Sequence, residues 1–117
     1  SLAIAQMEEL KNSTPEERAT LQTDWMKNNL SLDAKAAEAV SAINLKYAKE
    51  TQALMDSGEP KLGKMMTFRR NSDAKDAELR GLLTPQQYGQ YEQKKTQMEE
   101  MVKQKVMEKY QSSQSGG

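Results

Sequence analysis

The stretch Leu83-Thr84-Pro85-Gln86-Gln87 is the clearest indication of an α-helical fold in this chain, because it has the residues of a helix N-terminus. Thr84 stands at the N-cap position, where its hydroxyl can accept a hydrogen bond from the backbone N–H of Gln87. The Gln87 side chain can reach back to the N–H of Thr84, and a proline suits the first helical position. Leu83 can pack onto the first turn near Tyr88. The stretch therefore predicts a helix that begins at the proline.

Two other places in the sequence have the same kind of signal. Thr14-Pro15-Glu16-Glu17 places a hydroxyl at the N-cap and the Glu17 carboxylate at the third helical position, and Asp33 can cap a further helix. Glycine, proline and asparagine clusters mark the helix ends. No strand is predicted, since β-branched residues are scarce and no apolar alternation is present. The expected helices are about 3–12, 15–29, 33–57, 61–80 and 85–111.

The predicted helices have narrow apolar stripes. One stripe follows Ala36, Val40, Ile43, Tyr47 and Leu54, and the last helix repeats the pattern with Tyr88, Tyr91, Met98, Val102 and Val106. Such stripes pair helices but bury little surface, so dimerisation is expected to complete the core. We expect an all-α fold, an elongated antiparallel helical hairpin of four to five helices in a cradle-like dimer. Residues 1–111 are predicted to form a single helical domain and residues 112–117 a disordered tail, with Trp25 in the core or at a dimer interface.

Composition excludes several classes of function. The 117 residues include 17 basic and 17 acidic side chains but neither histidine nor cysteine, which excludes His- or Cys-dependent catalysis and ordinary zinc sites. Adjacent carboxylates such as Glu99-Glu100 point to different faces of a helix and form no catalytic pair. We therefore predict no enzyme, no catalytic residue, no cofactor and no metal site. Zero net charge argues against nucleic-acid binding, and no apolar run is long enough for stable membrane insertion.

The helix start at Leu83 also carries a family resemblance. It is an LTxxQ motif, and Leu30-Ser31-Leu32-Asp33 opens an earlier helix in the manner of a degenerate first copy, with Asp33 and Ala36 at the Thr and Gln positions. Two such helix starts, roughly fifty residues apart in a small helical chain rich in Met, Gln and Lys, resemble the Spy/CpxP family of periplasmic proteins. The resemblance covers about residues 14–110.

The resemblance implies long antiparallel helices that dimerise into a thin curved cradle. It implies a periplasmic protein whose signal peptide has been removed and which acts as an ATP-independent chaperone, or holdase, for unfolded or stress-exposed polypeptides. The alternative within the family is an envelope-stress signalling or structural accessory protein that binds one defined partner. If the resemblance is accidental, a cytosolic coiled-coil adaptor is the remaining interpretation. The motif residues Thr14, Glu17, Asp33, Leu83, Thr84 and Gln87 are expected to cap helices.

A basic and apolar segment provides the candidate client-binding surface. Cations can attract acidic segments of unfolded chains, and methionine adapts to many shapes because it is unbranched and polarisable. The alternative is that the methionines and the phenylalanine are ordinary core residues with solvated cations around them. The candidate residues are Lys61, Lys64, Met65, Met66, Phe68, Arg69 and Arg70.

Overall fold

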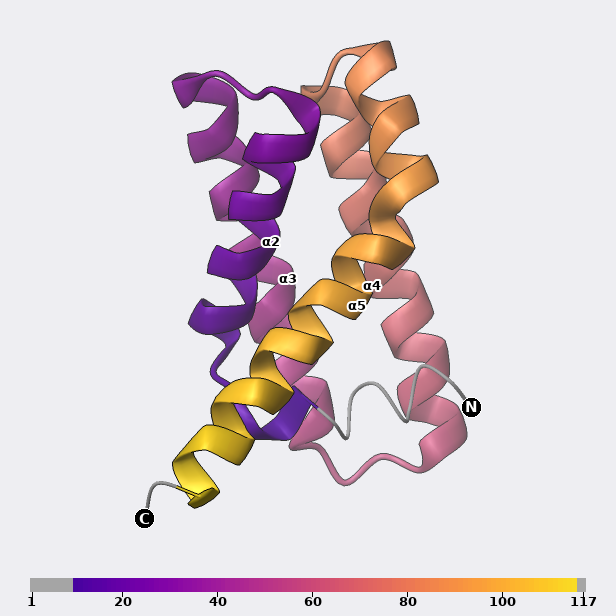
Figure 1. Ribbon diagram of the computed structural model, residues 1–117. Helices are drawn as coiled ribbons and strands as arrows, with labels where there is room; N and C mark the ends of the chain where they lie inside the picture. The colour runs from indigo at the N-terminus through magenta and orange to yellow at the C-terminus, as the bar shows by residue number, and fades with distance from the viewer. Residues whose placement is uncertain (1–9, 116–117) are drawn as a thin grey trace.

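The computed structural model describes residues 10–115, and all regular secondary structure in this part of the chain is helical, without a strand (Figure 1). The short 3₁₀-helix η1 (Leu10–Asn12) precedes four α-helices. These are α2 (Pro15–Leu30), α3 (Ala34–Met55), α4 (Lys61–Leu82) and α5 (Pro85–Ser115). The all-α prediction is thus confirmed for the described residues.

The helix bounds differ from the expected ones mainly at two places. The helix expected over 3–12 lies largely outside the described residues, and η1 covers its last three positions. The disordered tail was expected to begin at Ser112, but α5 continues to Ser115, so the predicted start of the tail is wrong. Polar residues such as Ser112 end a helix only weakly by themselves, since each costs well under 1 kcal/mol relative to alanine in a helix.

The three predicted N-caps are confirmed. Thr14 Oγ1 accepts from the N–H of Glu17 at 3.0 Å, and Asp33 Oδ1 accepts from the N–H of Ala36 at 2.8 Å. Thr84 and Gln87 exchange both bonds of a capping box, at 3.1 and 3.0 Å. The Glu17 carboxylate lies 3.2 Å from the ammonium of Lys109 near the end of α5, so it links two helices.

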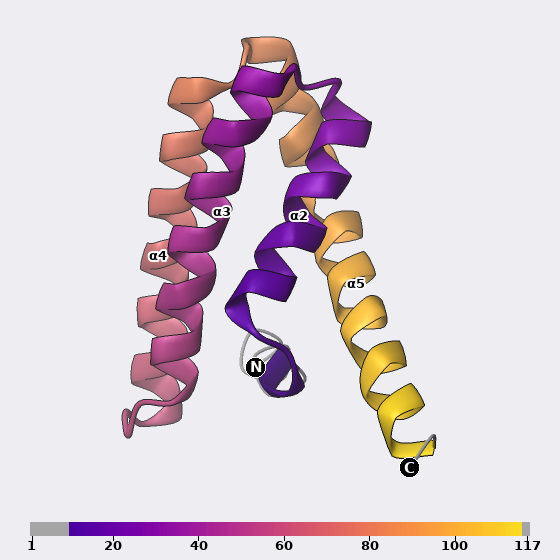
Figure 2. The ribbon, with the colours of Figure 1, turned by 90° about the vertical axis from the view of Figure 1, so that its left-hand side faces the viewer.

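The helices converge at one end of the molecule and diverge at the other (Figures 1 and 2). The turn between α2 and α3 and the turn between α4 and α5 lie together at the convergent end. α3 packs on both α2 and α4, whereas α5 starts beside the end of α4 and crosses diagonally to pack on α2 and η1. The result is a wedge with extents of 41 × 36 × 21 Å, broader than a single pair of helices.

The main apolar core lies at the convergent end. Val40, Leu79 and Met26 are fully buried there, and Trp25 packs against them from the side. The narrow stripes of the separate helices therefore meet around one core within a single chain. The other buried members of this core are Leu30, Leu83, Tyr91 and Met98.

A buried arginine organises the divergent end. Arg18 is only 2% exposed, and its Nη1 donates to the carbonyl oxygens of Leu10 and Ser13 and to Ser13 Oγ, at 2.9 to 3.1 Å. Its Nη2 donates to Gln52 Oε1 on α3 at 2.9 Å. The guanidinium thus fixes η1 to α2 and α3 through the fork geometry that lysine lacks. Close by, Leu54 and Met55 form a small second apolar cluster.

Candidate functional site

A cavity of about 160 Å³ lies where the helices diverge. η1, α2, α3, α4 and α5 all contribute to its wall, so residues far apart in the sequence meet around it. α4 presents Phe68, Asn71, Ser72, Lys75 and Asp76, which recur at three- and four-residue spacing on one face of the helix. This face is polar in its middle, where a helix of a tightly packed bundle would be apolar. The polar side chains in the middle of this face line the space between α4 and α5 instead of packing into an apolar core.

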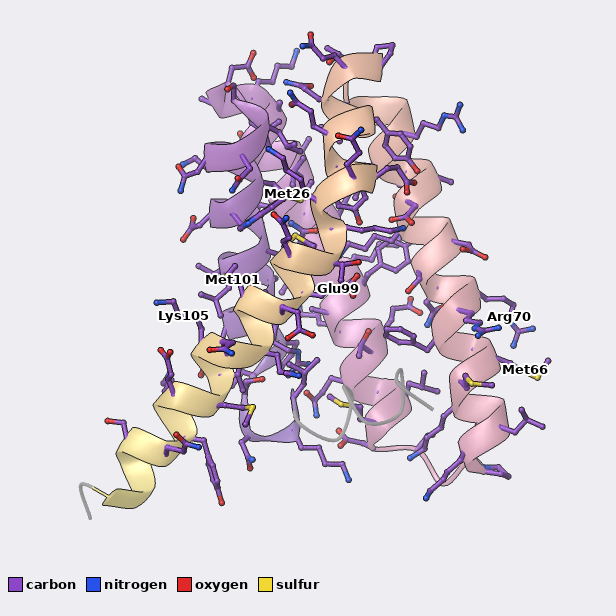
Figure 3. The ribbon with its side chains drawn as sticks, turned by 45° about the vertical axis from the view of Figure 1, so that its right-hand side comes forward. Met26, Met66, Arg70, Glu99, Met101 and Lys105 are labelled. Carbon is purple, nitrogen blue, oxygen red and sulfur yellow. The ribbon has the colours of Figure 1, made fainter. Side chains whose placement is uncertain are left out.

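α5 faces the cavity with a second regular series. Tyr91, Lys95, Met98, Glu99 and Val102 line it, again at helical spacing. Figure 3 shows Glu99 on the side of α5 that faces α4, whereas the labelled Met101 and Lys105 project from the other side. The cavity wall therefore combines charged and apolar groups from the same helix face.

Asp76 joins α4 to α5 at the edge of the cavity. Its Oδ1 accepts from the Tyr91 hydroxyl and its Oδ2 from Lys95 Nζ, both at 2.9 Å. Burial and the charge of Asp76 raise the pKa of the Tyr91 hydroxyl. Burial acts to lower the pKa of Lys95, but the hydrogen bond and the charge of Asp76 outweigh it and raise that pKa. Both charges of this ion pair are thus already satisfied within the protein.

Lys75 is in a different situation. Its Nζ lies 3.3 Å from the neutral Gln22 Oε1, and no carboxylate of residues 10–115 lies within 4 Å of it. Burial lowers the pKa of Lys75 to about 8, and the charges of Asp76 and Glu99 oppose this effect only in part. Removal of an ammonium from water without a paired anion is unfavourable, so the cavity holds a cation whose charge is incompletely compensated.

Glu99 is the counterpart of Lys75 on α5. The residue as a whole is exposed, but loss of hydration at its carboxyl raises the pKa of Glu99, and the charges of Lys95 and Lys75 oppose the rise. No ion pair within 4 Å is formed by Glu99 among the described residues. Lys75 and Glu99 therefore both line the cavity, and they form no direct ion pair with each other.

The predicted client-binding residues are divided between two faces of α4. Lys61, Met66, Arg69 and Arg70 are exposed, and Figure 3 shows Met66 and Arg70 pointing away from the other helices. Leu62 belongs with them, since it is 64% exposed and lies one turn before Met66, which is 55% exposed. We call Lys61, Leu62, Met66, Arg69 and Arg70 the outer face of α4.

The remaining predicted residues lie elsewhere. Phe68 is half-buried against Leu54 and Met55 and lines the cavity. Met65 is also half-buried, and Lys64 Nζ donates to the Met55 carbonyl oxygen at 3.2 Å. The partial burial of Met65 and Phe68 agrees with the alternative of ordinary core residues, whereas Lys64 is bound to a backbone carbonyl and is not the solvated cation that this alternative expects.

Sequence reasoning missed the polar residues of α4 that line the cavity, although Phe68 and the apolar lining residues of α5 were named for other roles. The spacing of Phe68, Ser72, Lys75, Asp76 and Leu79 is that of a helix face, but its polar centre gave no apolar stripe to follow. Polar residues at core-facing spacing, bounded by Phe68 and Leu79, were the signal that could have identified an interior site with polar groups.

The described residues show no arrangement for two other kinds of site. Residues 10–115 contain no group of three or more acidic side chains placed to hold a metal ion. None of the helices that the structure describes has a segment long and apolar enough to cross a bilayer.

Comparisons with known proteins give a family but no activity. A search of curated proteins gave no match, and a search of solved structures gave none. A family model matches residues 5–91, which include α2, α3, α4 and the first turns of α5. This match says nothing of the Spy/CpxP family, so that resemblance stays a prediction. The chain belongs to the family described as a domain of unknown function, DUF4890.

Proposed function

We propose that this protein binds other polypeptides through the outer face of α4 and acts as an ATP-independent holdase for unfolded chains. The observation that carries the proposal is the sparse burial of α4. Of its 22 residues only Leu79 is fully buried, and the first half of the helix exposes Leu62 and Met66 beside three cations. A helix of this length normally buries a continuous stripe, so an exposed apolar pair with a basic rim favours a binding surface.

The chemistry of the outer face suits unfolded segments that combine apolar and acidic residues. Leu62 and Met66 lie four residues apart and present flexible apolar surface to the same side. The charges of Lys61 and Arg69 have no carboxylate partner within 4 Å in residues 10–115, and Arg70 donates only to Thr67 Oγ1, at 3.4 Å. These cations would attract acidic clients over a Debye length of about 8 Å at physiological salt.

The compartment and the assembly belong to the same proposal. We place the protein in the periplasm on the resemblance of its helix starts to those of the Spy/CpxP family, and we propose a homodimer in which two outer faces form one cradle. A homodimer would double the number of apolar anchors available to one client, and linked weak contacts raise the overall affinity. Sedimentation equilibrium of the full chain measures the assembly state directly.

The function is tested by suppression of aggregation. Several unrelated denatured proteins are diluted into buffer with the full chain and without nucleotide, and light scattering is followed. The double variant Leu62→Ser/Met66→Ser is expected to lose most of the suppression while its melting temperature stays unchanged. The matched control is Leu82→Ser/Met107→Ser, since each of these side chains is 38% exposed outside the outer face. This control is expected to suppress aggregation as the parent chain does.

Two results would contradict the holdase. The first is an absence of suppression by the parent chain for every client tested. The second is equal suppression by the parent chain and the Leu62→Ser/Met66→Ser variant, which would move the activity away from α4. Binding of one folded partner, without suppression of aggregation, would instead support the accessory role.

A further inference from the structure

We propose that the central cavity is a binding site for a small amphipathic anion, a carboxylate with a medium-length apolar tail whose charge lies beside Lys75. The site lies on the inner face of α4, opposite the outer face, and is independent of the proposed holdase activity. It is built from side chains of α2, α3, α4 and α5 rather than from a single helix end.

The charge of the ligand follows from the state of the cations around the cavity. Arg18 donates to carbonyl and amide oxygens of the protein, Lys95 is paired with Asp76 at 2.9 Å, and Lys103 is paired with Glu100 at 3.5 Å. Among residues 10–115 the side-chain hydrogen bond of Lys75 Nζ goes to the neutral Gln22 Oε1, and no carboxylate lies within 4 Å of it. An incoming carboxylate would supply the anion that this half-buried lysine lacks, and hydrogen bonds between such ionised groups are among the stronger ones in proteins.

The apolar tail follows from the other wall. Leu10, Phe68, Ala48 and Val102 line the same cavity from four different elements. Removal of a methylene group from water contributes about 0.8 kcal/mol, so a tail placed against these side chains adds affinity with each carbon. An inorganic anion such as phosphate would leave this wall unused.

The volume sets the length of the tail. At roughly 10–15 Å³ of such space for each water molecule, about 160 Å³ corresponds to on the order of ten water-sized groups. Octanoate, with eight carbons and two oxygens, has about this size. It is therefore the probe of choice.

The first experiment is isothermal titration of the full chain with three probes. Octanoate is expected to bind at one site per chain, and octanol, which has the tail without the charge, is expected to bind at least ten-fold more weakly. Acetate, which has the charge without the tail, is expected to give no measurable heat. No saturable octanoate binding, or equal binding of octanoate and octanol, would overturn the proposal.

Two variants change the charge of the site in opposite directions. Lys75→Met keeps an unbranched side chain only one heavy atom shorter and removes its cation, and is expected to weaken octanoate binding at least ten-fold. Glu99→Gln removes the carboxylate that competes for Lys75 and is expected to tighten binding. The matched control is Lys49→Met on the exposed side of α3, outside the cavity, which is expected to bind octanoate as the parent chain does.

Proton uptake gives a readout that does not depend on the stability of the variants. At pH 8 a bound carboxylate should draw a proton onto Lys75, because an adjacent anion favours the charged form. Titrations in two buffers of different ionisation enthalpy are expected to show this uptake in the parent chain and its loss in Lys75→Met. Unchanged affinity and unchanged uptake in Lys75→Met would overturn the assignment of the anion to this residue.

Discussion

The Nε2 of Gln87 donates to the carbonyl oxygen of Leu30 at 3.3 Å, which ties the first turn of α5 to the last residue of α2. The same side chain accepts from the N–H of Thr84 through Oε1 at 3.0 Å. One glutamine thus closes the cap of its own helix and satisfies a carbonyl at the end of another. The glutamine of the LTxxQ motif therefore has a tertiary role that a glutamate could fill only in part.

Replacement of Gln87 by alanine is expected to lower the free energy of unfolding by about 1–2 kcal/mol, because a capping bond and an interhelical bond are lost together. Gln87→Glu keeps an acceptor for Thr84 but removes the donor to Leu30, so an intermediate loss is expected. Urea unfolding followed by circular dichroism measures both. Gln86→Ala, at the exposed neighbouring position, should stay within about 0.5 kcal/mol of the parent chain. An equal loss for both alanine variants would contradict the tertiary role.

Asn44 is a buried polar residue that is only half satisfied. It is fully buried on α3, and its Nδ2 donates to Thr23 Oγ1 at 3.0 Å, while its Oδ1 finds no hydrogen-bond partner among residues 10–115. Thr23 keeps its own bond to the Ala19 carbonyl oxygen whatever stands at position 44. Asn44→Leu is therefore expected to raise the free energy of unfolding by about 1 kcal/mol, since an unpaired buried acceptor is unfavourable. A decrease in stability would mean that a bound water satisfies Oδ1.

Lys75 gives the stability of the protein a pH dependence with a definite sign. Its pKa is about 8 in the folded chain, below its ordinary value of 10.5, so the unfolded chain binds more protons between these two values. The contribution of Lys75 to stability is therefore least favourable below pH 8 and improves as the pH rises toward 10.5. Lys75→Met is expected to be more stable than the parent chain at pH 7.

The measurement compares urea unfolding of the parent chain and Lys75→Met from pH 7 to pH 9.5. The difference between them is expected to shrink as the pH rises. The groups that face Lys75 are Asp76, Lys95 and Glu99, and the variant leaves all three in place. The range stops below pH 10 because tyrosines with raised pKa values, such as Tyr91, lower the free energy of unfolding as the pH rises above that value. A difference that stays constant with pH would contradict a lowered pKa at Lys75.

Sequence reasoning located the helices well because their starts are local. Thr14, Asp33 and Thr84 each cap the helix that follows through a bond spanning three residues, so a short stretch contains the whole signal. The end of α5 was predicted too early, since serine and glutamine disfavour a helix only slightly.

The cavity could not be predicted in the same way. Its geometry depends on which residues of α4 meet α5, and the pairing of Asp76 with Tyr91 and Lys95 spans two helices. The sequence around Lys75 does not distinguish it from a solvated lysine, because its hydrogen-bond partner Gln22 lies on α2, far away in the sequence. The exposure of Leu62 and Met66 likewise depends on the side of α4 that packs on α3. The sequence contains these residues, but only the tertiary arrangement gives them their environments.

The wedge shape has a consequence for backbone motion. The convergent end holds the main core around Met26, Val40 and Leu79, whereas the divergent end depends on a small cluster and the bonds of Arg18. Segments with few buried apolar contacts open at a lower free energy than the rest of a protein. The divergent end is therefore expected to open locally while the convergent end stays folded. Amide hydrogens near the turn between α3 and α4 should then exchange with deuterium long before those beside Leu79.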